Sequence, residues 1–190
     1  MKPREMYKKR KDDKHKREIN SLLASLVGKK KRPAIVLDAR NLNTKNALVK
    51  AGFPALKIHI PNPFDFKAIR KKHRNTYAQK LGDFLNQESG KHSLFYADYC
   101  CTVDGNADMK PMADIQTYFR KQLADNNSYF AFTFSYRNMR GVNFKYEDIQ
   151  RIESFVEQTA FKNGYAAIKH TGRIYSGMFF GLYDIKKLGS

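Results

Sequence analysis

Two apolar, β-prone runs in this chain each end abruptly in residues that can do chemistry. The run at 93–97 is followed by DYC, and the run at 129–134 is followed by SYRN. When helices cover both faces of a parallel sheet, ligands bind in the crevice outside the carboxyl ends of the strands. We therefore expect an acid, an aromatic ring, a thiol and a guanidinium to face one cleft: Asp98, Tyr99, Cys100 and Arg137.

Each residue of the DYC triplet has a chemical interpretation and a structural one. Asp98 at a strand end can orient a substrate, or it can cap the turn that follows. Tyr99 can stack on a flipped base, or it can belong to the core. Cys100 can supply the thiolate that cytosine C5 methylation needs, although a cysteine after a buried strand is more often a small buried hydrophobe. Together the three are the candidate catalytic residues.

Other acids of the chain raise the question of a metal site. Asp38 ends the apolar run at 34–37, and Asp104 lies shortly after Asp98. Their spacing matches no recognised metal-binding pattern, and the five histidines are scattered without an HExxH or Cys/His cluster. The sequence therefore predicts no metal site, and a metal-dependent nuclease using these acids ranks last among the functions considered.

The elements that must position these residues alternate along the chain. We expect strands at 34–37, 55–60, 93–97, 129–134, 165–170 and 174–185, and helices at 19–27, 44–51, 66–85, 112–124 and 145–163. The last two strands form a hairpin that turns at 171–173. The order predicts an α/β fold, a Rossmann-like mostly parallel sheet with helices on both faces and a C-terminal antiparallel β-hairpin.

The charge of the chain points to an anionic partner, most economically DNA or RNA. The net charge is +18 over 190 residues, and residues 1–32 carry 13 Lys/Arg against 4 Asp/Glu, so this sixth of the chain holds +9. We expect a basic N-terminal arm with a short helix at 1–32 and an α/β domain at 33–190. The candidate nucleic-acid-binding residues are Lys29, Lys30, Lys31, Arg32, Arg70, Lys71 and Arg137.

Cysteine usage and hydropathy bear on the compartment. The two cysteines are adjacent, Cys100 and Cys101, so they form neither a useful disulfide nor a CxxC pair. We expect a reducing intracellular compartment, cytoplasmic or nuclear. No apolar run approaches the length of a membrane span, which predicts no membrane partner. A protein partner stays open, and the oligomeric state cannot be predicted.

The arrangement over residues 33–185 resembles the class I S-adenosylmethionine-dependent methyltransferases, in which a hairpin follows a long last helix. In that family an acidic, glycine-rich loop after the first strand cradles the methionine part of the cofactor. Here VLDARNLNTKNALVKAGF keeps the acid, and a polar loop replaces the glycines, as in divergent members from large DNA viruses and mobile elements. The resemblance implies cofactor contacts from Asp38, Asn41, Asn43 and Thr44 in this segment, from Asn62 to the ribose, and from Asp83 to the adenine amine.

The resemblance implies S-adenosylmethionine as cofactor and methyl transfer to nucleic acid as function. Its fourth strand carries the catalytic-face motif, which matches Asp98-Tyr99-Cys100 here, and no DPPY or NPPY motif is present. The alternative is a catalytically inactive methyltransferase-like domain that binds DNA or RNA, or scaffolds a partner. Retention of cofactor binding separates the two.

Overall fold

The computed structural model describes residues 14–28, 30, 32–99, 101–135, 146–175 and 177–189. The strands form one sheet in the order β3-β2-β1-β4-β5-β7-β6. The strands are β1 (Ala34–Leu37), β2 (Ile58–Pro61), β3 (Thr76–Tyr77), β4 (His92–Asp98), β5 (Ala124–Ser135), β6 (Tyr165–Tyr175) and β7 (Met178–Lys187). The helices are α2 (Lys14–Val27), α3 (Asn43–Lys50), α4 (Phe66–Arg70), α5 (Leu81–Gln87), α6 (Pro111–Arg120) and α7 (Tyr146–Lys162), with a 3-10 turn η1 (Ala55–Lys57).

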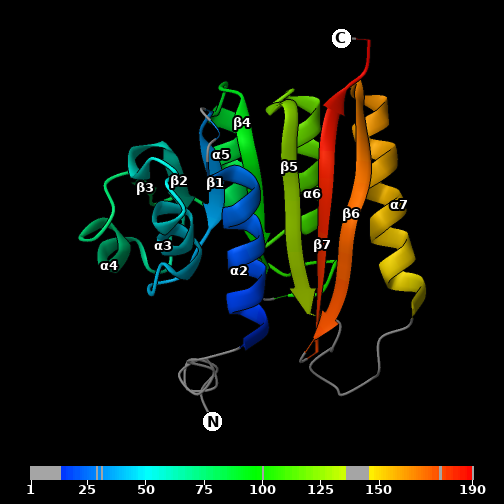
Figure 1. Ribbon diagram of the computed structural model, residues 1–190. Helices are drawn as coiled ribbons and strands as arrows, with labels where there is room; N and C mark the ends of the chain where they lie inside the picture. Colours follow the sequence, from blue (N-terminus) through cyan, green and yellow to red (C-terminus); the bar gives the residue numbers. More distant parts are fainter. Residues whose placement is uncertain are drawn as a thin grey trace.

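The sheet is parallel from β3 to β5 and antiparallel at its other end. β1 pairs in parallel with both β2 and β4, and β4 pairs in parallel with β5. β7 pairs antiparallel with β5 and with β6. The predicted Rossmann-like sheet with a C-terminal antiparallel hairpin is therefore confirmed, and the carboxyl ends of β1, β2, β4, β5 and β6 share one edge (Figure 1).

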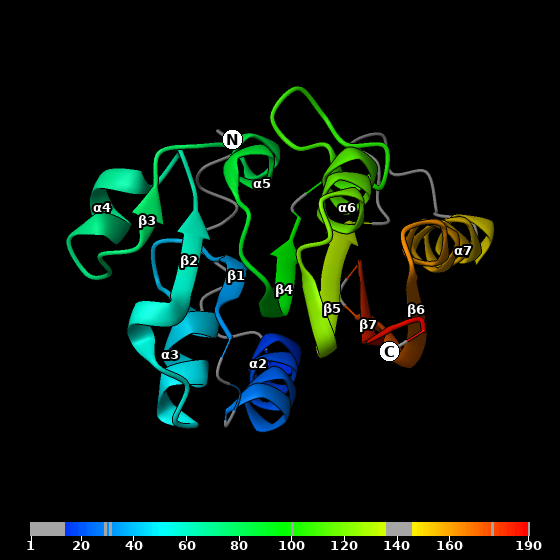
Figure 2. The same cartoon turned by 90° about the horizontal axis from the view of Figure 1, so that it is seen from above.

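Helices cover both faces of the sheet, as Figure 2 shows. α2 and α3 lie on one face, and α5, α6 and α7 lie on the other. Two apolar clusters fill the layers: one includes Leu23, Val36 and Phe180 on the α2 side, and the other includes Phe95 and Phe130 on the α6 side. Successive residues of a strand point to opposite faces, which explains why β1, β4, β5 and β7 each supply both clusters.

The N-terminal helix packs into the sheet's core instead of standing apart from it. Its apolar residues recur at helical spacing, and Ile19, Leu23, Ala24 and Val27 are buried. They share a cluster with residues of β1, β4 and β7. The predicted helix at 19–27 is confirmed, and it begins earlier, at Lys14.

The predicted helix at 66–85 is wrong. The segment forms α4, then the short strand β3, then α5. The backbone between the helices pairs with β2, because Ile60 N–H donates to Asn75 O at 2.9 Å and Asn62 N–H donates to Tyr77 O at 3.0 Å. Thr76 and Tyr77 favour strands, and pairing with β2 overrides the weak helical pattern. Similarly, the predicted strand at 55–60 begins only at Ile58, after η1.

The predicted turn of the terminal hairpin is also misplaced. Residues 171–173 lie inside β6, where the pairing register shifts between Lys169 and Thr171. Gly172 faces Gly181 across the strands, and a Cβ on Gly172 would contact the ring of Phe179 at 3.4 Å. The chain turns instead beside Gly177, whose φ of +82° suits glycine.

Candidate active site at the carboxyl edge of the sheet

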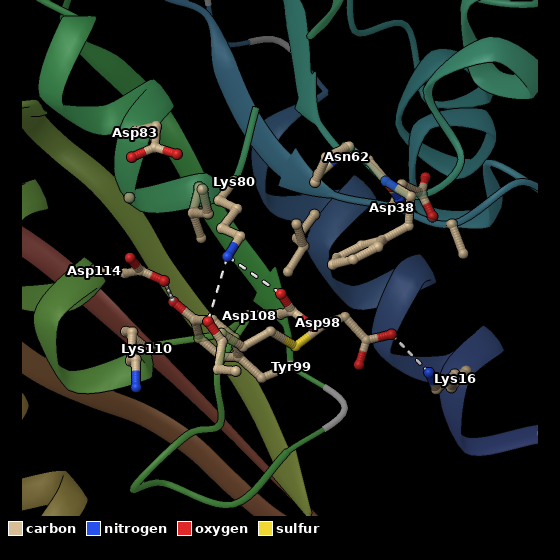
Figure 3. Close-up of a pocket in the computed structure, with 18 residues that line it drawn as sticks. Lys16, Asp38, Asn62, Lys80, Asp83, Asp98, Tyr99, Asp108, Lys110 and Asp114 are labelled. Atoms are coloured by element: carbon tan, nitrogen blue, oxygen red, sulfur yellow. Dashed lines mark hydrogen bonds and ion pairs between the residues drawn. The ribbon is translucent and has the colours of Figure 1, made fainter. Parts of the chain in front are cut away.

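A cavity of about 300 Å³ opens at the carboxyl ends of β1, β2 and β4 (Figure 3). Five of the residues predicted from the sequence line it: Asp38, Asn62, Asp83, Asp98 and Tyr99. Five further ionisable residues complete its polar wall: Lys16, Lys80, Asp108, Lys110 and Asp114. The two acids predicted at strand ends, Asp38 and Asp98, therefore line the same cavity.

Asp38 is buried at the end of β1, with 8% of its surface exposed. Its Oδ2 accepts the backbone N–H of Lys45 at 2.8 Å, so the carboxylate caps the start of α3. Burial raises the pKa of Asp38 to about 6, although backbone N–H groups of Lys45 and Thr44 favour the ionised form. A buried carboxylate of this kind gains free energy when a cation binds beside it.

The polar loop predicted to replace the family's glycines does not reach the cavity. Asn41 and Asn43 are exposed, and Thr44 is buried against α2, where its hydroxyl donates to Asn20 Oδ1 at 3.0 Å. None of these three lines the cavity. Leu42 bends the loop with φ 55° and ψ 38°, a left-handed conformation that a glycine adopts more easily.

Asn62 holds the ends of β1 and β2 together. Its Nδ2 donates to Asp38 O at 2.9 Å, and its Oδ1 accepts the backbone N–H groups of Phe64 and Asp65, both at 2.9 Å. The side-chain amide has two N–H donors. Since one of them bonds to Asp38 O and the amide has no second acceptor among the residues that the structure describes, the other N–H can bond to a group at the cavity wall.

Asp98 ends β4 with both carboxylate oxygens engaged. Oδ2 lies 2.6 Å from the ammonium of Lys16, which reaches across from α2, and Oδ1 accepts the hydroxyl of Thr133 on β5. The Asp98 side chain is 21% exposed and that of Lys16 is 39% exposed. This ion pair forms the α2 side of the cavity wall.

Tyr99 lies in the core and not on an open face. It is 1% exposed, and its hydroxyl donates to Asp114 Oδ2 at 3.0 Å. Burial raises the pKa of Asp114 to about 6, opposed by the Tyr99 hydrogen bond and reinforced by the nearby charge of Asp83. A ring held this way orients Asp114 and cannot stack on an incoming base without leaving the core.

Lys80 and Asp83 flank the cavity on the α5 side. Lys80 Nζ pairs with Asp108 Oδ1 at 3.2 Å and donates to Ala107 O at 3.3 Å, which ties the segment after β4 to the start of α5. Asp83 is exposed in the first turn of α5. Sequence reasoning missed Lys80 and Asp108 because nothing in their local sequence indicates a contact between such distant positions.

The predicted basic residues fall in two places. Lys30 donates to Asn127 O at 2.9 Å and Arg32 pairs with Asp125 at 3.7 Å, both at the start of β5. α2 has 14 residues and spans about 21 Å, so this cluster lies at the edge of the sheet opposite the cavity. Arg70 and Lys71 lie at the end of α4, at the β3 side (Figure 2). Four of the predicted site residues lie outside the part of the chain that the structure describes: Cys100, Lys29, Lys31 and Arg137.

The guanidinium of Arg70 is occupied within its own segment. It donates to the carbonyl of Arg74 and, at 3.4 Å, to that of Thr76. The Lys71 side chain is exposed.

The three acids considered for metal chemistry do not form one cluster, since Asp38 and Asp98 line the cavity and Asp104 does not. Asp104 lies outside the cavity and forms an ion pair with Arg151. Within the described part of the chain, no three His, Cys, Asp or Glu side chains are placed to hold a metal ion. Among the helices of the described ranges, none is long and apolar enough to cross a membrane.

Comparison with known proteins identifies the fold of the chain but no protein family. The sequence matches no protein-family model, and no curated protein is similar to it. Trm1 from Pyrococcus horikoshii, solved with S-adenosyl-L-methionine, aligns with a TM-score of 0.63 at 9% identity over 93% of this chain and 56% of that chain. Magnesium protoporphyrin IX methyltransferase from Synechocystis, with bound cofactor, gives 0.56 at 14% identity over 91% and 79%.

A structure described as a putative rRNA methylase from Clostridium thermocellum gives a TM-score of 0.61 at 9% identity, covering 90% of this chain and 96% of that chain. The strand order and the terminal hairpin agree with these likenesses. The chain therefore has the Rossmann-like fold of class I S-adenosylmethionine-dependent methyltransferases.

Proposed function

We propose that this protein is an S-adenosylmethionine-dependent methyltransferase that acts on nucleic acid. One observation carries the proposal. Asp38, Asn62, Asp83 and Asp98 come from four separate segments, and all four line one cavity at the carboxyl edge of a methyltransferase-type sheet.

The charges of the cavity suit this cofactor. S-adenosylmethionine carries a sulfonium and an ammonium group, and the wall holds five carboxylates against three lysines. Two of the lysines already pair with carboxylates, Lys16 with Asp98 and Lys80 with Asp108. The remaining acids, Asp38, Asp83 and Asp114, leave an anionic interior that favours a cationic ligand.

Each residue would have a distinct task. Asp38 would hold the ammonium of the methionine part, the second N–H of Asn62 would bond the ribose, and Asp83 would accept the adenine amine. The cofactor supplies a methyl group on an electrophilic sulfonium. Asp98, fixed by Lys16 and Thr133, would orient the acceptor atom in line with that methyl group, so the protein contributes mainly positioning and exclusion of water.

Nucleic acid is the acceptor that the charge supports best. The chain carries +18, and one solved structure of similar fold is described as a putative rRNA methylase. A polycation of this size binds phosphate backbones through counterion release.

Calorimetric titration with S-adenosylmethionine tests the cofactor step. We expect micromolar binding that Asp38→Asn weakens about tenfold or more, because a charged hydrogen-bond partner is lost. Asp65→Asn is the matched control, since Asp65 pairs with Arg40 outside the cavity. No binding at millimolar cofactor would overturn the proposal.

One observation favours a second candidate, a methyltransferase-like domain without catalysis. The β1–α3 loop lacks the family's glycines, and Leu42 takes the left-handed conformation in their place. If the titration shows no cofactor binding while nucleic acid still binds, this second candidate is the better account.

A further inference from the structure

A row of four residues runs across the sheet from the cavity to its far side. Asp98 pairs with Thr133, Thr133 with Phe180, and Phe180 with Arg173. Residues in register on neighbouring strands point to the same face. Three inter-strand spacings of about 4.8 Å separate Asp98 from Arg173 by about 14 Å.

The first turns of α2 lie across this row and contact both of its ends. Lys16 pairs with Asp98 at 2.6 Å, and Glu18 Oε2 lies 3.6 Å from Arg173 Nη1. Figure 1 shows α2 beginning at the edge where β5 and β6 end. Asp98 and Arg173 thus lie on the same face of the sheet, at two sides of the first turns of α2, with Thr133 and Phe180 fully buried between them.

A second hollow, of about 350 Å³, lies at the Arg173 end of the row. Its lining comes from α2 and the end of β6: His15, Glu18, Ile19, Arg173, Ile174 and Tyr175. The rings of His15 and Tyr175 are 5.5 Å apart at 37°. Ile174 is in register with Phe179, so its side chain points to the other face of the sheet. The hollow thus combines a guanidinium with planar and apolar surface, which is the chemistry that binds a phosphate and a base.

We propose that this hollow is an acceptor subsite that binds one nucleotide of a single strand, next to the nucleotide presented at Asp98. The phosphate binds the guanidinium of Arg173, and the base stacks on the imidazole ring of His15. The proposal rests on the proposed function for its second nucleotide, the one at Asp98. The hollow itself recognises phosphate and base whether or not methyl transfer occurs.

Glu18 sets the strength of this subsite. Its carboxylate lies at long range from the ammonium of Lys14 at 4.0 Å, the imidazole of His15 at 3.9 Å and the guanidinium of Arg173 at 3.6 Å. An incoming phosphate competes with Glu18 for Arg173 and is repelled by its charge. A phosphate offers Arg173 shorter, charge-assisted hydrogen bonds, so it can displace Glu18.

Two opposite charge changes test the subsite. Fluorescence anisotropy measures binding of short labelled single-stranded RNA and DNA of mixed sequence to the full chain, over a series of salt concentrations. Arg173→Gln should lower the salt slope of log Kd by about one, because one phosphate contact is lost. Glu18→Gln should tighten binding, since it removes the competing carboxylate.

The controls make the same charge changes elsewhere. Arg120→Gln alters the end of α6, and Glu157→Gln alters α7 on the other face of the sheet; both side chains are exposed. The subsite is supported if Arg173→Gln and Glu18→Gln shift binding in opposite directions while both controls stay within about twofold of wild type, since surface charges far from a contact act weakly.

If the subsite variants changed nucleic-acid binding no more than the control variants do, the proposal would be overturned. Failure of the wild-type protein to bind either probe would also overturn it. If only RNA or only DNA binds, that probe is used to compare the subsite variants with the control variants, and their contrast decides the subsite. Running the series with and without S-adenosylmethionine keeps the two proposals separate: absent cofactor binding overturns the methyltransferase function, whereas the contrast between Arg173→Gln and Arg120→Gln still decides the subsite.

Discussion

Lys16 on the N-terminal helix and Asp98 at the end of β4 are 82 residues apart in the sequence, and their Nζ and Oδ2 atoms lie 2.6 Å apart. The pair fastens the start of α2 to the strand end where the acceptor would lie. A group that uses Asp98 Oδ2 must share it with the Lys16 ammonium. The N-terminal helix therefore bears directly on the proposed chemistry.

Lys16→Met should lower the free energy of unfolding by about 1 kcal/mol or less, because the pair is partly exposed to solvent. Urea denaturation measures the change, and a double-mutant cycle with Asp98→Asn isolates the coupling between the two side chains. Lys14→Met is the control, since Lys14 is 79% exposed and 4.0 Å from Glu18. A coupling energy of zero would show that the pair contributes nothing to stability in solution.

Cofactor affinity should depend on pH through Asp38. Burial raises the pKa of this carboxyl to about 6, and only the ionised form attracts an ammonium. Affinity should therefore be constant above about pH 7 and fall below about pH 6, approaching tenfold per pH unit for one linked proton. Calorimetry across this range tests it, with Asp38→Asn expected to bind weakly at every pH. An equally steep fall in that variant would assign the titration to another group.

Tyr99→Phe should destabilise the protein by about 1–2 kcal/mol, because it leaves the buried carboxyl of Asp114 without its 3.0 Å donor. The loss also removes a hydrogen bond that favours the ionised form, so the pKa of Asp114 should rise above about 6. Urea denaturation and a carboxyl NMR titration measure the two effects.

Tyr118→Phe is the matched control for this change. Tyr118 is also fully buried in the same apolar cluster, and its hydroxyl has no hydrogen-bond partner among the described residues. Its removal should cost little or stabilise the fold. If the two variants behaved alike, the Tyr99–Asp114 hydrogen bond would contribute nothing.

The sequence predicted the strand ends better than the segments between them. Asp38, Asn62 and Asp98 each follow a short apolar run, and the parallel pairing of β1 with β2 and β4 brings those ends to one cavity. Local apolar pattern is enough for this, since parallel strands covered on both faces are apolar throughout.

The misplaced elements depend on contacts that no local pattern contains. β3 exists because residues 75–77 pair with β2, and the hairpin turns at Gly177 because Gly172 is held inside β6 opposite Gly181. Lys16 was missed for the same reason, since a lysine in a basic helix gives no sign that its partner lies at a distant strand end. The strand β3, the position of the hairpin turn and the Lys16–Asp98 ion pair all depend on contacts between distant segments.

Stability should fall in acid through His92, at the start of β4. The imidazole is 1% exposed, its Nε2 is 3.9 Å from Glu88 Oε2, and its Nδ1 has no hydrogen-bond partner in the described part of the chain. Burial lowers its pKa from 6.5 to about 4. The unfolded chain therefore binds the proton more readily, so the stability that neutral His92 contributes is complete above about pH 6.5 and is lost as the pH falls toward about 4.

Replacing His92 by glutamine removes this titration, so the variant's unfolding free energy should decline less between about pH 7 and about pH 5, by about 2 kcal/mol. The measured quantity is the difference in unfolding free energy between wild type and variant at each pH. This is necessary because the raised pKa values of Asp38 and Asp114 make both proteins more stable as the pH falls over the same range. Parallel curves for wild type and His92→Gln would show that the imidazole is protonated or hydrated in the folded state.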